Sequence, residues 1–251
     1  MRVAANAVTL LRACGRLGRV LVHVLAGAWT VWRVFPRLSA AQKEERIQAW
    51  ARELLEVLAI QLIANGTPPQ GGPVLLVANH VSWLDIVVVH ATGPCRFVSK
   101  ADVQHWPLVG ALAAGAGTLF IERASRRDAM RLVHHMAACL HQGEVLAVFP
   151  EGTTGDGTQL LPFHANLLQA AIAAQAPAQP VALHYAEAST GALSLAPCYV
   201  GDDSLVHSIW RTARAPGLVA VVTFGAPEAA QGRDRRTWAN DLRNRIAALR
   251  G

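Results

Sequence analysis

The chain has 251 residues, a length that allows one large α/β domain or such a domain with an N-terminal appendage. Hydrophobic residues make up 52% and charged residues 16%, and the mean hydropathy of +0.27 indicates that some apolar surface faces lipid or a partner. The net charge of +6 suits anionic lipid or an acidic carrier protein. An aromatic content of 6%, without a basic block interleaved with aromatics, argues against a nucleic-acid partner.

The cysteines are scattered along the chain, and none lies at metal-ligand spacing from another cysteine or a histidine. They are Cys14, Cys95, Cys139 and Cys198. This pattern is typical of reduced, buried thiols in a cytosolic compartment, and we expect no bound metal.

The N-terminal region combines arginines with a short apolar run, VLVHVLAGAWTVWRVF, at residues 20–35. The preceding arginines are Arg2, Arg12, Arg16 and Arg19. Because a membrane span needs roughly 20 apolar residues, this run, which contains His23, is marginal. It favours a helix in the cytoplasmic leaflet, with Trp29 and Trp32 at headgroup level and the arginines on lipid phosphates. An ordinary buried helix is the alternative.

A second helix is expected after Pro36. Ser39 and Gln42 form a capping-box pattern, and the helical periodicity continues to about Ile63. The segment NGTPPQGGP, residues 65–73, is the clearest break in the chain. The predicted organisation is therefore an N-terminal membrane-associated helical pair at 1–64, a linker at 65–73 and a catalytic domain at 74–251.

Strands and helices alternate from residue 74 onward. The predicted strands are 74–78, 96–99, 117–121, 145–149, 180–184 and 219–224. The predicted helices are 82–91, 106–114, 125–141, 162–175 and 234–249. The less regular stretch 187–217 is expected to hold an antiparallel strand and a short helix. This alternation predicts an α/β fold with a mostly parallel central sheet flanked by helices.

The stretch LLVANHVSWLD, residues 75–85, ends a buried strand on a histidine. In α/β sheets, ligands gather where strands end. A neutral imidazole at His80 can take a proton from a hydroxyl, and a carboxylate on its other nitrogen fixes the tautomer. Asp85 follows five residues later, across a turn into a helix, and can return to the ring. The alternative is a helix-capping histidine with Asp85 in solvent.

Three further stretches follow in order: TLFIERASRRDA (118–129), LAVFPEGTTGDG (146–157) and AQPVALHY (178–185). Together with NHVSWLD they resemble the four sequence blocks of the glycerolipid acyltransferase family, which includes 1-acylglycerol-3-phosphate acyltransferase. The resemblance covers about residues 73–185. It is specific, because chance does not readily place F-P-E-G-T at this distance after N-H-x-S-x-x-D.

The resemblance implies that His80 is a general base and that Asp85 orients it. The residues that it places on the acceptor's polar head are Arg123, Glu151, Gly152, Thr153 and Lys100. An arginine offers a bidentate fork to phosphate, and a glycine lets the chain approach closely. For Glu151, contact with an acceptor hydroxyl, pairing with Arg123 and a structural role all stay open. The resemblance also implies that the fourth block, Pro180 to Leu183, lies on the acyl-donor side.

The implied reaction moves a fatty acyl chain from acyl-CoA or acyl carrier protein to a lysolipid hydroxyl, at the cytoplasmic face of the inner membrane. The thioester is already activated, so no cofactor, metal or nucleophilic serine is required. Backbone N–H groups are the usual stabilisers of the oxyanion.

One position departs from the family pattern. The third block commonly continues with an arginine, and this chain has Thr154. The sequence there is similar to the lyso-ornithine lipid acyltransferase branch. A phosphate-bearing acceptor such as 1-acylglycerol-3-phosphate is slightly favoured, because the region stays basic at Lys100, Arg123, Arg126 and Arg127. Remote alternatives are a serine lipid hydrolase using Ser82, which lacks the G-x-S-x-G turn, and a non-enzymatic membrane-binding protein.

Overall fold

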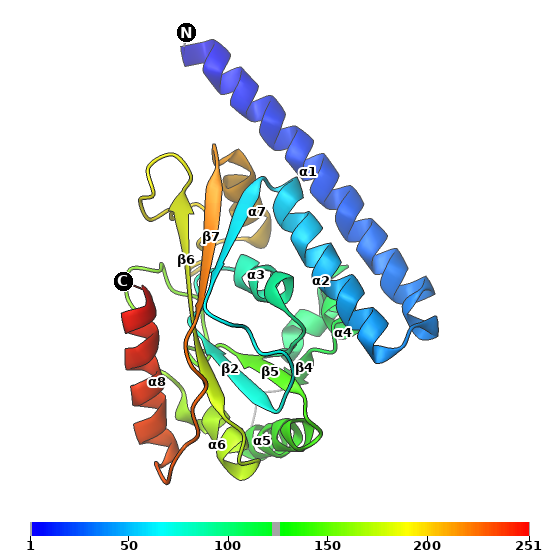
Figure 1. Ribbon diagram of the computed structural model, residues 1–251. Helices are drawn as coiled ribbons and strands as arrows, with labels where there is room; N and C mark the ends of the chain where they lie inside the picture. Colours follow the sequence, from blue (N-terminus) through cyan, green and yellow to red (C-terminus); the bar gives the residue numbers. More distant parts are fainter. Residues whose placement is uncertain (1, 122–125, 251) are drawn as a thin grey trace.

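The computed structural model describes the backbone of residues 2–121 and 126–250 and the side chains of residues 7–121 and 127–250. Its centre is a 7-stranded sheet in the order β1-β7-β6-β2-β5-β3-β4 (Figure 1). The strands are β1 Ile60–Asn65, β2 Val74–Ala78, β3 Arg96–Lys100, β4 Leu119–Ile121, β5 Val145–Val148, β6 Ala178–Glu187 and β7 Leu218–Phe224. Neighbouring strands are parallel except β6 and β7. The predicted α/β class with a mostly parallel sheet is confirmed.

Helices cover both faces of the sheet. The first hydrophobic core holds side chains of α2 Ala40–Val57, α3 Leu84–Thr92 and α7 Leu205–Arg214, and the second those of α5 Arg126–His141, α6 Leu168–Ala173 and α8 Arg235–Arg250. Strand β2 contributes to both, with Leu76 in the first core and Leu75 and Val77 in the second. A strand buried on both faces reads as a continuous apolar run, which is what residues 74–78 show.

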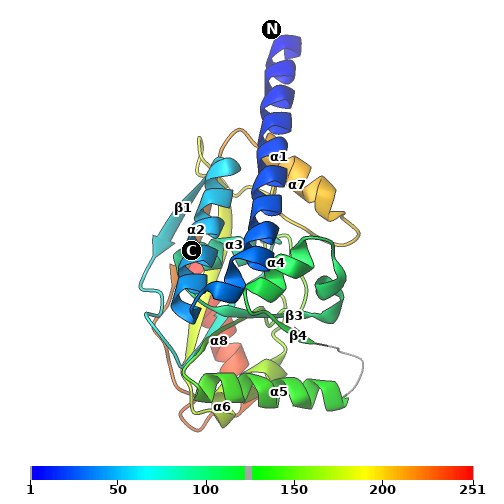
Figure 2. The same ribbon diagram turned by 90° about the vertical axis from the view of Figure 1, so that its right-hand side faces the viewer.

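The long helix α1, Arg2–Arg33, lies along α2 and projects beyond the rest of the molecule at its N-terminal end (Figure 2). His23 of α1 stacks on Trp50 of α2 with ring centroids 4.9 Å apart. Arg16 donates from Nη1 to the carbonyls of Ala213 and Ala215, where α7 ends. Among the described residues, no helix has both the length and the apolar character needed to cross a bilayer.

Short elements complete the chain: 3-10 helices at Phe35–Arg37, Ala101–His105 and Ala165–Leu167, and helix α4 Val109–Gly115. The predicted capping box at Ser39 and Gln42 is present. The stretch 187–217 contains α7 and an antiparallel bridge between Leu193 and Ala186, while the antiparallel strand pairing is that of β6 with β7.

The prediction of a helix to about Ile63 is wrong. Helix α2 ends at Val57, Ala59 turns the chain at a φ of 57°, and residues 60–65 form β1. This strand pairs in parallel with β7 at one edge of the sheet. The sheet therefore begins before the Gly/Pro-rich segment 65–73.

Candidate active site

Polar residues meet at the carboxyl edge of the parallel strands. His80 follows the end of β2, Glu151 follows β5, and Lys100 is the last residue of β3. Since β2, β3 and β5 run in parallel, these ends lie on one edge. This is where open α/β sheets bind ligands.

His80 and Asp85 are in direct contact. The Nδ1 atom of His80 lies 2.8 Å from Oδ2 of Asp85. A carboxylate only accepts hydrogen bonds, so the imidazole proton resides on Nδ1 and the lone pair on Nε2 is available to take up a proton. The Asp85 side chain is fully buried, whereas that of His80 is 17% exposed. The histidine therefore reaches solvent and the carboxylate behind it does not.

Asp85 is held by three further donors. Its Oδ2 accepts from the backbone N–H groups of Val81 and Ser82 at 2.7 and 2.9 Å. Its Oδ1 accepts from the hydroxyl of Tyr185 at 2.6 Å. Burial and the neighbouring Asp85 raise the pKa of Tyr185 well above its ordinary value, so this hydroxyl stays a donor. The carboxylate is thus fixed in position from both sides.

Stacked aromatic rings pack against one face of the His80 imidazole and orient it. The ring of Phe149 stacks on that of His80 with centroids 3.9 Å apart and an angle of 6°, and Phe97 stacks behind Phe149 at 5.4 Å. Beside it, Asn79 bonds the backbone of Leu183 twice, donating to its carbonyl and accepting from its N–H. The end of β2 is therefore tied to β6.

Glu151 is buried and uses both carboxylate oxygens on backbone donors. Oε1 accepts from the N–H of His80 at 2.9 Å, and Oε2 accepts from the N–H of Leu161 at 3.0 Å. Burial raises the pKa of Glu151, and these two backbone hydrogen bonds oppose the rise. Of the roles left open for Glu151, this geometry favours the structural one.

The residues after Glu151 form a tight loop. Gly152 has a φ of 71°, a conformation that suits glycine, and its N–H donates to Phe149. Thr153 is exposed, and the hydroxyl of Thr154 donates to the carbonyl of Tyr199. The N–H of Gly155 then donates to the carbonyl of His80 at 2.8 Å. The loop therefore returns to His80, beyond the end of β2.

Of the two predicted cations of the acceptor site, the structure describes Lys100. Lys100 is exposed at the carboxyl edge, and it lies in register with Ile121 of β4. Arg123 lies outside the described residues.

Ser82 is unsuited to be a nucleophile. It is fully buried, its hydroxyl donates to the carbonyl of Pro197, and its oxygen accepts from the N–H of Leu84. The geometry therefore argues against the hydrolase alternative.

Tyr185 was not identified as a site residue from the sequence, although it ends the stretch 178–185. A usable signal was present: Val181, Leu183 and Tyr185 alternate along β6 and share one face of the strand. A phenol in line with two core residues needs a buried partner.

A mostly parallel sheet with a buried acid behind a histidine at its carboxyl edge fits the α/β acyltransferase class that the sequence blocks resemble. The sequence model of the family described as Acyltransferase matches residues 59–184. The chain belongs to this family and is an acyltransferase of lipid biosynthesis.

Relatives with two different acceptors are similar to it. The lyso-ornithine lipid O-acyltransferase of Pseudomonas aeruginosa is 36% identical over 94% of this chain and 91% of its own. The 1-acyl-sn-glycerol-3-phosphate acyltransferase of Neisseria meningitidis is 36% identical over 79% of this chain and 78% of its own. The crystal structure of the 1-acyl-sn-glycerophosphate acyltransferase PlsC from Thermotoga maritima shares the fold, with a TM-score of 0.70 at 18% identity over 98% of each chain.

Proposed function

We propose that this acyltransferase moves a fatty acyl chain from acyl-CoA or acyl carrier protein to the free hydroxyl of a lysolipid. The observation that carries the proposal is the 2.8 Å contact between His80 and Asp85 at the carboxyl edge of the sheet. This pair supplies a base with a fixed tautomer on a side chain that reaches solvent. A thioester donor brings its own activation, so the residues need no cofactor for this chemistry.

The proposed reaction has two proton transfers. Nε2 of His80 takes the proton of the acceptor hydroxyl as the oxygen attacks the thioester carbonyl carbon. Asp85 stabilises the resulting imidazolium without taking its proton. The C–O bond forms, the C–S bond breaks, and His80 returns the proton to the departing thiolate. The products are the acylated lipid and a free thiol.

For the acceptor, we favour lyso-ornithine lipid, which reverses the slight preference for a phosphate-bearing acceptor. Thr154 stands where the family commonly has an arginine, and its hydroxyl is turned to the carbonyl of Tyr199. A cation at this position is therefore missing. The Pseudomonas relative that covers 94% of this chain is named for the same acceptor. A lysophosphatidate acceptor is the second candidate, supported by the exposed Lys100 and by the Neisseria relative.

We place the enzyme on the cytoplasmic face of the inner membrane through α1. This helix carries an exposed apolar surface, here called the α1 stripe, whose side chains are each 47–73% exposed: Val8, Leu10, Leu11, Leu21, Val22, Leu25, Trp29 and Trp32. Several members recur at spacings of three and four residues, so they share one helix face. Arg12 and Arg19 on the same helix suit anionic headgroups.

An acceptor panel with one labelled acyl group tests the proposal. Lyso-ornithine lipid and lysophosphatidate are compared, each with acyl-CoA and with acyl carrier protein as donor. We expect ester product with lyso-ornithine lipid, and no turnover by His80→Ala with any pair. Full turnover by His80→Ala would overturn the proposed chemistry.

The variant Thr154→Arg tests the acceptor separately. A charge-assisted contact to phosphate is worth roughly 1.5–3 kcal/mol, which is about one to two orders of magnitude. We expect Thr154→Arg to raise kcat/KM for lysophosphatidate relative to lyso-ornithine lipid by up to this factor. Thr154→Val is the control without a charge. An unchanged preference in Thr154→Arg would remove the argument from this position.

A further inference from the structure

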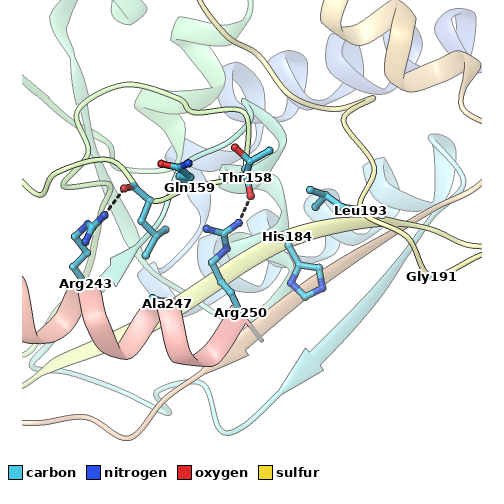
Figure 3. A pocket seen from close by; sticks show the side chains of 10 residues that line it. Thr158, Gln159, His184, Gly191, Leu193, Arg243, Ala247 and Arg250 are labelled. Atoms are coloured by element: carbon cyan, nitrogen blue, oxygen red, sulfur yellow. Dashed lines mark hydrogen bonds between the residues drawn. The ribbon is translucent and has the colours of Figure 1, made fainter.

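The loop at residues 157–161 is held by two arginines of α8 (Figure 3). Arg243 donates from Nη2 to the carbonyl of Leu160 at 2.6 Å and from Nε to the carbonyl of Leu161 at 3.0 Å. Arg250 donates to the carbonyl of Gly157. Both arginines line a cavity of about 690 Å³ that has neither His80 nor Asp85 among its lining residues. These arginines therefore act from outside the candidate active site.

Arg243 is nevertheless linked to Glu151 through a single peptide group, and through Glu151 to the backbone of His80. The carbonyl of Leu160 and the N–H of Leu161 belong to the same peptide. Its oxygen faces the Arg243 guanidinium, and its N–H donates to Oε2 of Glu151 at 3.0 Å. The other oxygen of Glu151 accepts from the N–H of His80 at 2.9 Å. The contacts form a continuous sequence from cation to peptide to carboxylate to the backbone of the histidine.

The charges of this arrangement reinforce one another. A guanidinium on the peptide oxygen polarises the amide and makes its N–H a stronger donor to the carboxylate. The Glu151 carboxyl group is a stronger hydrogen-bond acceptor in its ionised form than in its protonated form. Arg250 has no such link, because its acceptor, Gly157, lies outside the peptide that meets Glu151. The two arginines therefore differ in their link to Glu151 although they hold the same loop.

We infer that Arg243 is a positioning residue of the acyltransferase, which keeps Glu151 ionised and so fixes the backbone of His80. This inference rests on the proposed role of His80 as the base. The set of Arg243, the 160–161 peptide, Glu151 and the His80 N–H is called the Arg243–Glu151 chain below. Both carboxylate oxygens of Glu151 are taken up by backbone N–H groups, so we expect Arg243 to affect the rate of the bound complex rather than acceptor binding.

The ionisation of Glu151 makes this inference sensitive to pH. Among the described residues, the groups that act on the pKa of Glu151 are the two N–H donors, the His80 ring and the Asp85 carboxylate, and burial together with Asp85 raises this pKa. Protonation would turn one oxygen into a donor that faces an N–H group, and the geometry would be lost. The N–H of Leu161 is one of the donors that lower the pKa of Glu151. Removing Arg243 should weaken this donor, so we expect the pKa of Glu151 to rise further. Activity that depends on ionised Glu151 then fails at a higher pH.

The test measures kcat and acceptor KM from pH 5 to 8.5 with micellar lysolipid and a labelled acyl thioester. For Arg243→Met we expect kcat to fall by about tenfold at neutral pH with KM changed less than about twofold. The acid limb of the kcat profile should move upward by about one pH unit. Arg243→Lys keeps a donor and a charge, so it should recover part of the rate.

The matched control is Arg250→Met, the same substitution on the same helix against the same loop. It should leave the acid limb in place. A double variant separates linkage through Glu151 from general damage to the fold. Glu151→Gln should be slower than Arg243→Met, and adding Arg243→Met to Glu151→Gln should cost no further rate.

Two outcomes overturn the inference. In one, Arg243→Met lowers kcat by the same factor with and without Glu151→Gln. In the other, the acid limb stays in place in Arg243→Met or moves equally in Arg250→Met. If Arg243→Met is poorly folded by thermal unfolding, Arg243→Lys and Arg243→Gln supply the comparison of pH profiles. A fully active His80→Ala would instead refute the proposed function, whichever way Arg243 behaves.

Discussion

At the residue scale, Asp85 is the most constrained group of the site. Its two oxygens accept four hydrogen bonds, and three of these come from residues 80–82 on the same loop. Because Asp85 follows His80 by only five residues, its carboxylate can bind both the imidazole and the backbone N–H groups of the intervening turn. Only Tyr185 is contributed from a distant part of the chain. This makes Tyr185 the informative position to change.

Tyr185→Phe should keep the ring packing and remove the hydroxyl that donates to Asp85 Oδ1. Leaving a buried acceptor unsatisfied costs about 1–3 kcal/mol, so we expect the free energy of unfolding to fall by that amount. Because Asp85 becomes less fixed, kcat should fall by about tenfold. Denaturant unfolding and steady-state kinetics measure the two effects. Asp85→Asn is the comparison and should lose about three to four orders of magnitude in kcat. A Tyr185→Phe protein with unchanged stability and rate would show that this hydroxyl is dispensable.

How much of the site could be predicted differs from residue to residue. The contact of His80 with Asp85 was predictable, because both lie on one short turn after a strand with a clear apolar pattern. The contacts of Glu151 were not, since its partners are backbone N–H groups of His80 and Leu161, which carry no side-chain signal. The resemblance suggested Glu151 for the acceptor head, and the geometry favours a structural role instead.

At the element scale, the core strands were predictable because each is a short apolar run between turn residues. Strand β1 was not, for a local reason. A helix end with a left-handed residue is usually marked by glycine, and here that conformation is adopted by Ala59 at a φ of 57°. Without a glycine, the apolar residues of 60–63 continue the periodicity of α2. Only their pairing with β7 identifies them as a strand.

The α1 stripe yields a prediction at the same scale. Val22 and Trp29 are 67% and 58% exposed, so replacing both with aspartate removes apolar area without disturbing the core. Burying each side chain in lipid is worth about 1.5–3 kcal/mol, and the double variant should bind anionic vesicles about two to four orders of magnitude more weakly. Vesicle co-sedimentation measures this, with turnover of micellar substrate as the test of folding.

The control for the stripe is Met130→Asp, which changes an apolar side chain that is 61% exposed on α5. Helix α5 lies at the other end of the molecule from the projecting part of α1 (Figure 1). The proposed membrane role of α1 would be contradicted if Met130→Asp weakened vesicle binding as much as the stripe variant, or if the stripe variant bound normally.

At the scale of the whole molecule, both helical layers hold the loops of the candidate site. From one layer, Arg211 of α7 donates to the carbonyls of Ala196 and Cys198. The same segment, residues 196–199, accepts a hydrogen bond from Ser82 and donates one to the carbonyl of Val81. From the other, Arg243 of α8 holds the loop at 157–161. Each helical layer thus supplies an arginine that holds a loop next to the candidate site by donating to its backbone carbonyls.

Helix α1 is part of this framework in addition to its proposed role as a lipid-facing surface. It meets the end of α7 through Arg16, and it approaches α2 so closely at Gly27 that an added Cβ would lie 2.5 Å from Nε1 of Trp50. At Gly115 of α4, an added Cβ would lie 2.6 Å from Val31 of α1. A helix that only lay in lipid would not need such fitted contacts.

Gly27→Leu therefore separates the two roles of α1. Overpacking at a close contact costs about 1–3 kcal/mol, and in a chain of this size the melting temperature should fall by about 2–10 °C. Because α1, α7 and the site loops are packed together, kcat with micellar substrate should fall too, whereas the stripe variant should keep both its melting temperature and its micellar rate. Differential scanning calorimetry and micellar kinetics on both proteins make the comparison. If Gly27→Leu melts and turns over like the unmodified enzyme, α1 is a detachable anchor, and the site does not depend on its packing.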